Sequence, residues 1–254
     1  MHVQDKVAII TGASSGFGKA LANRLVGKGA KVILADIDIK DGERLANELN
    51  YNKTEKVAYF VKCDVTNYDH QVEMFKAAEK YFGGVDIIVN NAGIAEKRPL
   101  WEDEAGVWKK VIDIDLSAVI EGTRLGVAAL KKQGRGGVII NTASLAGLYP
   151  QVKTPVYSAA KFGVIGLTRS FKDFGHNIRV NAVAPSFSDT KIISDVKELI
   201  MTMAPLVPVE MVIDAFMLLI EDDSYSGDVA RITPKYGVSV IGRTVGGTEK
   251  KAKL

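Results

Sequence analysis

The sequence has little of what disulfide scaffolds, metal centres and membrane spans require. Cys63 is the only cysteine among 254 residues, so no internal disulfide can form and a reducing compartment suits the chain. Three scattered histidines, His2, His70 and His176, lack the spacing of metal ligands. No apolar run is long enough to cross a membrane, and the N-terminus lacks the apolar core of a signal peptide. We therefore expect no bound metal, no membrane insertion and a cytoplasmic location.

Charge of one sign is also not in excess. The chain has 33 Lys and Arg against 30 Asp and Glu, a net charge of +3, so no surface for nucleic acid is implied. Its last residues, Ala252-Lys253-Leu254, resemble the Ser-Lys-Leu peroxisomal address. In a eukaryote this ending favours the peroxisome, and the alternative is a frayed basic tail. We expect residues 245–254 to be a flexible tail.

Apolar strands alternate with amphipathic helices along the chain, without repeats or a linker. The predicted strands are Lys6–Ile10, Lys31–Ala35, Val57–Val65, Val85–Val89, Gly137–Thr142, Ile178–Val183 and Asp228–Thr233. The predicted helices are Lys19–Lys28, Tyr68–Phe82, Trp101–Leu130, Val156–Phe174 and Val209–Ile220. This alternation predicts a single α/β domain over residues 1–254, a Rossmann-type doubly wound parallel sheet of about seven strands with helices on both faces.

A glycine-rich stretch lies between the first strand and the first helix. Gly12 permits a tight turn, Gly16 lets the backbone approach a ligand, and Gly18 allows the helix to pack closely on the strand. Free N–H groups at the start of the helix then face a diphosphate. The candidate cofactor residues of this loop are Gly12, Ser14, Ser15, Gly16, Phe17 and Gly18. A plain tight turn is the alternative for the glycines alone.

An acidic residue ends the second strand. Asp36 lies close to the distance of about 20 residues from the glycine loop at which a carboxylate meets the adenosine ribose. It would accept hydrogen bonds from the ribose hydroxyls and repel a 2′-phosphate, which selects NAD over NADP. The loop has serines at positions 14 and 15, and no Arg or Lys stands there to favour NADP. An ordinary acid at a strand end is the alternative.

Three side chains around the fifth strand suit alcohol–ketone chemistry. Tyr157 and Lys161 share one face of the helix after that strand, and Ser144 closes the strand. A nearby ammonium lowers the pKa of a phenol, which can then act as the acid or base, while the serine holds the substrate oxygen. The alternative is that Lys161 and Tyr157 form an ion–aromatic pair on the surface without a catalytic role. The glycine loop upstream and Ser144 favour the catalytic role.

These pieces together resemble the short-chain dehydrogenase/reductase family over nearly the whole chain. The matching motifs are Thr11–Gly18, Asp64-Val65, Asn90–Gly93, Ser144, Tyr157-Ser158-Ala159-Ala160-Lys161 and Ile178-Arg179-Val180-Asn181. The resemblance implies that Asp64 and Val65 contact the adenine, that Asn90 and Gly93 line the adenosine side, and that Lys161 also holds the nicotinamide ribose. Thr190 would lie by the carboxamide. The further cofactor contacts are assigned to Ile37, Asn91, Ala92, Tyr157, Pro185 and Phe187.

Within the family, the stretches around the site look most like NAD-linked 15-hydroxyprostaglandin dehydrogenases, and insect-type alcohol dehydrogenases are similar. Asp115 stands where the family usually has an asparagine that anchors a proton-relay water, so we count it among the catalytic residues. Ser186 replaces the usual glycine after Pro185, and Thr154 replaces a substrate-contacting glutamine. The segment between Lys161 and Asn181, which helps to form the subunit interface in the family, is shorter than usual. We expect a homodimer or homotetramer.

The sequence thus predicts an NAD-dependent dehydrogenase that interconverts a secondary alcohol and a ketone on an apolar, lipid-derived small molecule. Ser144, Tyr157, Leu148, Thr154 and Phe187 are the candidate substrate contacts. Residues 192–206, rich in Met and Leu, would form a lid, with a core helix as the equal alternative. Two rival functions are an NAD(H)-binding protein with weak or no catalysis because of Asp115, and an NADPH-dependent carbonyl reductase.

Overall fold

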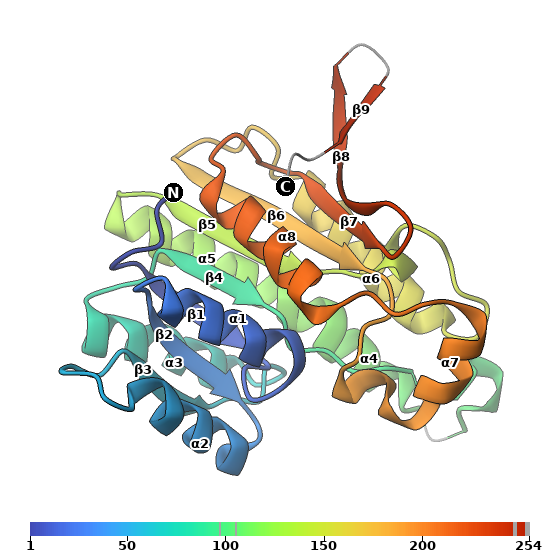
Figure 1. Ribbon diagram of the computed structural model, residues 1–254, viewed down its shortest axis with the longest axis horizontal. Coiled ribbons are helices and arrows are strands. Elements are labelled where there is room, and N and C mark those ends of the chain that lie inside the picture. The colour runs from blue at the N-terminus through green and yellow to red at the C-terminus, as the bar shows by residue number, and fades with distance from the viewer. Residues whose placement is uncertain (97, 105, 246–247, 252–254) are drawn as a thin grey trace.

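The computed structural model describes residues 1–96, 98–104, 106–245 and 248–251, and its strands form one sheet (Figure 1). Seven strands are parallel: β1 (Val7–Thr11), β2 (Lys31–Asp36), β3 (Ala58–Lys62), β4 (Ile87–Asn90), β5 (Gly137–Thr142), β6 (Ile178–Pro185) and β7 (Val229–Thr233). Two more, β8 (Gly237–Val245) and β9 (Thr248–Lys251), continue it antiparallel. The order is β3-β2-β1-β4-β5-β6-β7-β8-β9.

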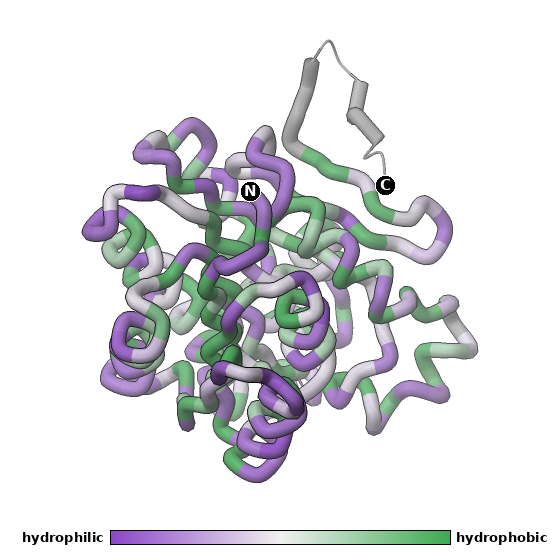
Figure 2. The backbone as a smooth tube through the Cα atoms, turned by 60° about the vertical axis from the view of Figure 1, so that its left-hand side comes forward, coloured by the Kyte–Doolittle hydropathy of each residue, from purple (hydrophilic) through white to green (hydrophobic). Residues whose placement is uncertain are grey.

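Helices cover the sheet on both faces. One face carries α1 (Gly16–Gly27), α2 (Ile39–Asn50) and α8 (Val209–Glu221), whose buried side chains pack on alternate strand residues such as Ile10 and Leu34. The other carries α3 (Tyr68–Phe82), α5 (Ala118–Gln133) and α6 (Pro155–Arg169). Strand side chains point alternately to the two faces, so strands buried on both sides read as continuous apolar runs. Figure 2 shows these apolar strands running through the interior.

The sheet order brings the candidate residues to one edge. The chain starts in the middle at β1, winds outward through β2 and β3, and returns to β4 on the other side of β1. In open α/β sheets, ligands bind beyond the carboxyl ends of the strands at such a switch point, which here lies between β1 and β4. Gly12, Asp36, Asn91, Ser144 and Ser186 all lie at these ends. The prediction of a doubly wound α/β sheet is confirmed.

Several details differ from the sequence-based expectation. The sheet has two antiparallel strands beyond the seven expected, and β9 lies within the stretch 245–254 predicted as a flexible tail. Residues 252–254, the candidate peroxisomal address, lie outside the described residues. The stretch 101–130, predicted as helical overall with weak points at Gly122 and Gly126, begins its helix later than expected. A 3-10 turn (Leu100–Glu102) comes first, and α4 (Trp108–Ile112), a π-helical turn (Asp113–Ser117) and α5 then follow one another directly, with both glycines inside α5. Helix α2 was not predicted, and α6 ends at Arg169, before the expected Phe174.

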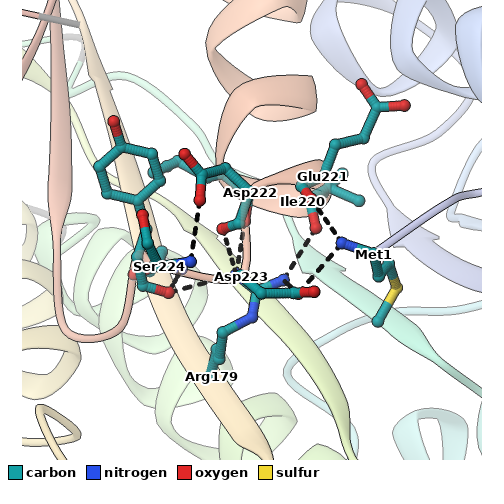
Figure 3. A network of polar contacts seen from close by, with 10 residues as sticks. Met1, Arg179, Ile220, Glu221, Asp222, Asp223 and Ser224 are labelled. Atoms are coloured by element: carbon teal, nitrogen blue, oxygen red, sulfur yellow. Dashed lines mark hydrogen bonds and ion pairs between the residues drawn. The ribbon is translucent and has the colours of Figure 1, made fainter.

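A buried arginine fixes the end of α8 to the sheet. Arg179, near the start of β6, donates hydrogen bonds to the carbonyl oxygens of Leu219, Ile220, Asp222 and Tyr225 and pairs with Asp223 (Figure 3). Leu219 and Ile220 lie in the last turn of α8, where carbonyl oxygens have no partners further along the helix, and Asp222 and Tyr225 follow it. The guanidinium therefore serves as the C-terminal cap of α8.

No helix in the described part of the chain is both long and apolar enough to span a membrane. Among the same residues, no group of three or more His, Cys, Asp or Glu is arranged to hold a metal ion.

Candidate active site

The glycine loop between β1 and α1 is packed too tightly for larger residues. Gly12 has a φ of +62°, and a Cβ at this position would lie 2.9 Å from the Cα of Ala92. A Cβ at Gly18 would lie 2.3 Å from the carbonyl oxygen of Gly12. The loop is also tied to the end of β4, because the Thr11 hydroxyl accepts hydrogen bonds from the N–H groups of Asn91 and Ala92. The first and third glycines thus have the steric roles predicted for them.

The N-terminus of α1 is left open to an anion. Its N-cap residue, Ser15, makes no side-chain capping bond, and its first turn holds no acidic residue. By contrast, α2 and α3 are capped by the side chains of Asp38 and Asn67. Uncapped N–H groups and the positive end of the helix dipole suit a diphosphate. Ser15, Gly16 and Phe17 are partly exposed there.

Asp36 lies at the end of β2, beside the glycine loop. Its Oδ2 accepts hydrogen bonds from the backbone N–H and the hydroxyl of Ser14, at 2.9 and 2.6 Å, and its Oδ1 accepts one from the N–H of Asp38. A carboxylate has about four acceptor positions, so one remains for a ribose hydroxyl. Ile37, the next residue, is 68% exposed and open to a ligand.

The adenine-side residues differ in exposure. Asp64 is exposed beyond β3, and hydrogen bonds from the Thr66 hydroxyl and N–H hold the pKa of its carboxyl below the ordinary value. Val65 is partly buried next to it. Asn90 is buried, and its amide bonds to Asn141 and Thr123, so it supports the strand ends from within instead of lining the adenosine side.

The three predicted catalytic side chains come together beyond the end of β5. Ser144 lies two residues beyond the end of that strand and makes a side-chain hydrogen bond with Tyr157. The Lys161 ammonium lies 5.5 Å from the centre of the Tyr157 ring. Lys161 Nζ donates to the carbonyl oxygen of Thr142 at 3.0 Å and is only 3% exposed. The arrangement follows from the helical spacing of Tyr157 and Lys161 and from the short connection between β5 and α6.

Asp115 completes this group from the π-helical turn between α4 and α5. It is fully buried, and its Oδ1 accepts a hydrogen bond from the N–H of Ile94 at 2.9 Å and lies 4.0 Å from Lys161 Nζ. Its Oδ2 has no hydrogen-bond partner in the described structure. Gly93 makes this approach possible, since a Cβ there would lie 2.9 Å from Asp115 Oδ1. Burial raises the pKa of Asp115 above its ordinary value, against the opposing effects of Lys161 and Ile94.

The electrostatics of Tyr157 differ from the simple prediction. Burial raises the pKa of its phenol, and the Asp115 carboxylate adds to this; the Lys161 ammonium and the Ser144 hydrogen bond only partly offset them. The lysine therefore lowers this pKa as expected, but the net shift is upward. The phenol is held in its protonated form at neutral pH.

The candidate substrate side lies around the loops after β5 and β6. Leu148 and Thr154 are partly buried, and Phe187 is 41% exposed. Pro185 is buried as the last residue of β6, and Thr190 is close enough to the glycine loop that a Cβ at Gly16 would lie 3.5 Å from its methyl group. The predicted lid contains a 3-10 segment (Lys191–Val196) and α7 (Lys197–Met203).

Two contacts of this region were not predicted. Glu96, in the loop after β4, accepts hydrogen bonds from the N–H groups of Val156 and Tyr157. Lys191, at the start of the lid, pairs with Asp41 and Asp38 at the start of α2. These partners lie 60 or more residues apart in sequence, and no local pattern connects them.

Comparison with known proteins agrees with this geometry. The family model described as short chain dehydrogenase matches residues 6–199. Over 94% of both chains, the sequence is 35% identical to the 15-hydroxyprostaglandin dehydrogenase (NAD⁺) of Homo sapiens. It is also 40% identical to 3beta-hydroxysteroid dehydrogenase 2 of Eggerthella lenta, over 74% of this chain and 72% of that one.

Solved structures give the same picture. A short-chain dehydrogenase/reductase from Burkholderia phymatum in complex with NAD superposes with a TM-score of 0.81, at 26% identity over 89% of each chain. A 3-ketoacyl-(acyl-carrier-protein) reductase from Brucella melitensis complexed with NADH gives 0.83, at 28% identity over 91% of this chain and 97% of that one. The glycine loop, the strand-end residues and these matches lead to one conclusion: the chain belongs to the short-chain dehydrogenase family.

Proposed function

We propose that this protein is an NAD-dependent dehydrogenase that interconverts a secondary alcohol and a ketone on an apolar substrate. The observation that carries the proposal is the grouping of Ser144, Tyr157 and Lys161 beyond β5, on the same sheet edge as the open N-terminus of α1. The curated relatives compared above are, by their names, dehydrogenases of a hydroxyprostaglandin and of a hydroxysteroid. The catalytic side chains and the cofactor-binding loop thus support the same reaction.

Each residue has a defined task in the oxidative direction. Ser144 orients the substrate oxygen, Tyr157 as phenolate accepts the hydroxyl proton, and Lys161 stabilises the phenolate charge. The nicotinamide, when bound, supplies the hydride acceptor. Asp115, packed against Lys161, sets the local field and offers a free acceptor, Oδ2, for a water on the path of the proton. In the reductive direction the Tyr157 phenol donates the proton instead.

The cofactor is assigned to NAD by the surroundings of Asp36. A 2′-phosphate placed near this carboxylate would be repelled, and no Arg or Lys follows in the loop to compensate. A ribose hydroxyl instead finds an acceptor. The relatives that bind or are named for NAD are consistent with this choice. An NADPH-dependent carbonyl reductase is correspondingly disfavoured.

An apolar substrate is supported by the lid. The N–H of Val207 donates to the carbonyl oxygen of Phe187 at 2.7 Å, which closes the segment between them into a loop with a narrow neck. Ile193 and Ile200 are buried, whereas other large apolar side chains of the lid are exposed: Ile192, Val196, Leu199 and Met201. Such a segment can cover an apolar molecule when the site closes.

A homodimer is proposed as the minimal assembly. Ile120 on α5 and Phe162 on α6 are 45% and 44% exposed, and these two helices are neighbours on one face of the sheet. A second copy would bury this apolar surface. Light scattering of the purified protein tests the assembly, and a monomer at micromolar concentration would contradict it.

A second function, NAD(H) binding with weak catalysis, is favoured by the upward shift of the Tyr157 pKa to which Asp115 contributes. The two are separated by following NADH absorbance with NAD and then NADP. The panel contains long-chain hydroxy fatty acids, prostanoids, hydroxysteroids and simple secondary alcohols. Turnover with NAD that falls by about 10²- to 10⁴-fold in Tyr157→Phe, with NAD binding retained, establishes the dehydrogenase. Tight NAD binding without turnover supports the second function, and a preference for NADP overturns the cofactor assignment.

A further inference from the structure

The N-terminus of the catalytic helix is capped from a distant loop. The N-cap residue of α6, Thr154, makes no side-chain capping bond, and Pro155 follows it without an N–H to donate. The next two N–H groups, of Val156 and Tyr157, both donate to Oε2 of Glu96 at 3.0 Å. One carboxylate therefore serves the free donors of the first turn, a task that Ser, Thr, Asp or Asn at the N-cap usually performs.

The same loop also makes a hydrogen bond to Asp115, the carboxylate beside Lys161. Ile94, two residues before Glu96, donates its N–H to Asp115, which lies beside Lys161. Three residues of chain thus connect the carboxylate next to the lysine with the backbone of the tyrosine. A displacement of this loop would disturb both Asp115 and the backbone of Tyr157.

We propose that Glu96 is a positioning residue for Tyr157, an inference that rests on the proposed dehydrogenase function. Its two hydrogen bonds fix the backbone from which the reacting phenol projects, and a misplacement of about 1 Å can cost about a hundredfold in rate. Its charge also opposes the positive end of the α6 dipole, which otherwise stabilises the phenolate.

One oxygen of the Glu96 carboxylate is buried at an energetic cost. Glu96 Oε1 is buried and has no hydrogen-bond partner in the described structure, although an unpaired buried oxygen is costly. An amide could accept the same two N–H bonds without a charge. Glu96 therefore has two roles, holding the backbone of α6 and supplying a negative charge. A glutamine would keep the first role and lose the second.

The experiment compares Glu96→Gln, Glu96→Ala and a control, Glu102→Ala, which removes an exposed carboxylate from the same loop. Hydrogen exchange of the peptide that contains Val156 and Tyr157 reports the capping bonds without any need for turnover. Steady-state kinetics separate kcat from KM for the alcohol and for NAD. Nicotinamide fluorescence measures NADH binding, and thermal unfolding shows that each variant folds.

We expect Glu96→Ala to speed exchange at the start of α6 and to lower kcat by about ten- to a hundredfold, with NADH binding and the KM for NAD unchanged. Glu96→Gln restores slow exchange and kcat to within about threefold of the wild type. Both variants remove the negative charge that opposes the α6 dipole, so both move the pH midpoint of oxidation downward by about half a unit. The other charges that face Tyr157, those of Asp115 and Lys161, stay the same. The control changes none of these quantities.

Unchanged exchange at Val156 and Tyr157 in Glu96→Ala would overturn the proposal, whatever the activity. So would an equal loss of kcat in both Glu96 variants, which would show that the hydrogen bonds to Oε2 do not position the tyrosine. If the wild type oxidises no alcohol of the panel, the proposed function fails, but the role of Glu96 can still be tested. Exchange and the ultraviolet titration of Tyr157, taken as a difference from Tyr157→Phe, then decide the role of Glu96.

Discussion

Lys161 Nζ and Asp115 Oδ1 lie 4.0 Å apart, and both side chains are almost completely buried. Each has a further polar partner, the carbonyl oxygen of Thr142 for the lysine and the N–H of Ile94 for the aspartate. Burial of this pair beneath Tyr157 places a negative charge close to a group that must itself become negative in alcohol oxidation. The charge state of Asp115 therefore affects both activity and stability.

Asp115→Asn should shift the pH dependence of oxidation to lower pH. The Asp115 carboxylate raises the pKa of Tyr157, so its removal favours the phenolate that acts as base. The asparagine keeps an acceptor for the Ile94 N–H, so the loop stays in place. kcat should be measured against pH for the wild type and Asp115→Asn with the same alcohol. An unchanged midpoint would mean that Asp115 is neutral in the working enzyme, and a midpoint that moves upward would contradict the assigned effect of its charge on Tyr157.

Asp115→Asn should also stabilise the protein, and more so at higher pH. Burial raises the folded-state pKa of Asp115 above its unfolded value, so the folded protein favours the protonated form. Below the unfolded pKa the carboxyl is protonated in both states and its burial is not penalised. As the pH rises through the folded pKa of Asp115, the wild-type protein loses the stability that it has with a protonated carboxyl. An asparagine at this position does not titrate, so the variant has no such loss. Melting curves of both proteins should diverge from acid to neutral pH, with Asp115→Asn the more stable at neutral pH.

Lys191→Gln should speed the release of NADH. Lys191 Nζ lies 3.2 Å from Asp41 and 3.9 Å from Asp38, so it joins the start of the lid to the start of α2. All three side chains are partly or largely exposed, and such pairs contribute little each, so we expect a two- to fivefold faster release, roughly. Salt should speed release from the wild type more than from the variant.

Lys197→Gln is the matched control for that experiment. Lys197, the first residue of α7, pairs with Asp189 in the loop after β6, so its removal breaks an ion pair that does not involve α2. Stopped-flow fluorescence of bound NADH measures all three release rates. Equal acceleration in both lysine variants would show that lid charge in general, and not the link to α2, controls release.

The sequence predicted the parts of the site that depend on local spacing. Tyr157 and Lys161 share a helix face because they are one turn apart, and Gly12 and Gly18 leave space where the backbone itself approaches. Asp36 and Ser144 reach the site because carboxyl ends of parallel strands meet at one edge. For these residues, the chain order and the sheet topology are enough.

Other features depend on how loops return to the site. Glu96 reaches α6 through an irregular loop, and neither end of that contact carries a pattern. The upward pKa shift of Tyr157 is a consequence of burial, which no spacing reveals. The late start of the helix predicted over 101–130 did have a signal: the Asp103 carboxylate accepts hydrogen bonds from the N–H groups of Val107 and Trp108 and so starts α4. An acid before an apolar helical pattern is a recognised start signal, and here it competed with a continuous apolar period.

Arg179→Met should destabilise the fold while leaving the chemistry intact. Arg179 is near the amino end of β6, at the sheet edge opposite the site, and its guanidinium donates to four carbonyl oxygens at and after the end of α8. Methionine keeps the apolar stem but removes every donor. At least two of these bonds are buried, so we expect a loss of about 3 kcal/mol in the free energy of unfolding and a fall in Tm of roughly 6–12 °C.

The control for Arg179→Met is Arg44→Met, which removes a guanidinium that is 57% exposed on α2 and pairs only with side-chain carboxylates. Its Tm should stay close to that of the wild type, because exposed ion pairs contribute little. Below its melting range, Arg179→Met should keep the kcat of the wild type, since α8 lies on the face of the sheet opposite α6 and its catalytic tyrosine and lysine. A fall in kcat without a fall in Tm would show instead that the end of α8 communicates with the site through β6, whose last residues lead directly into the lid.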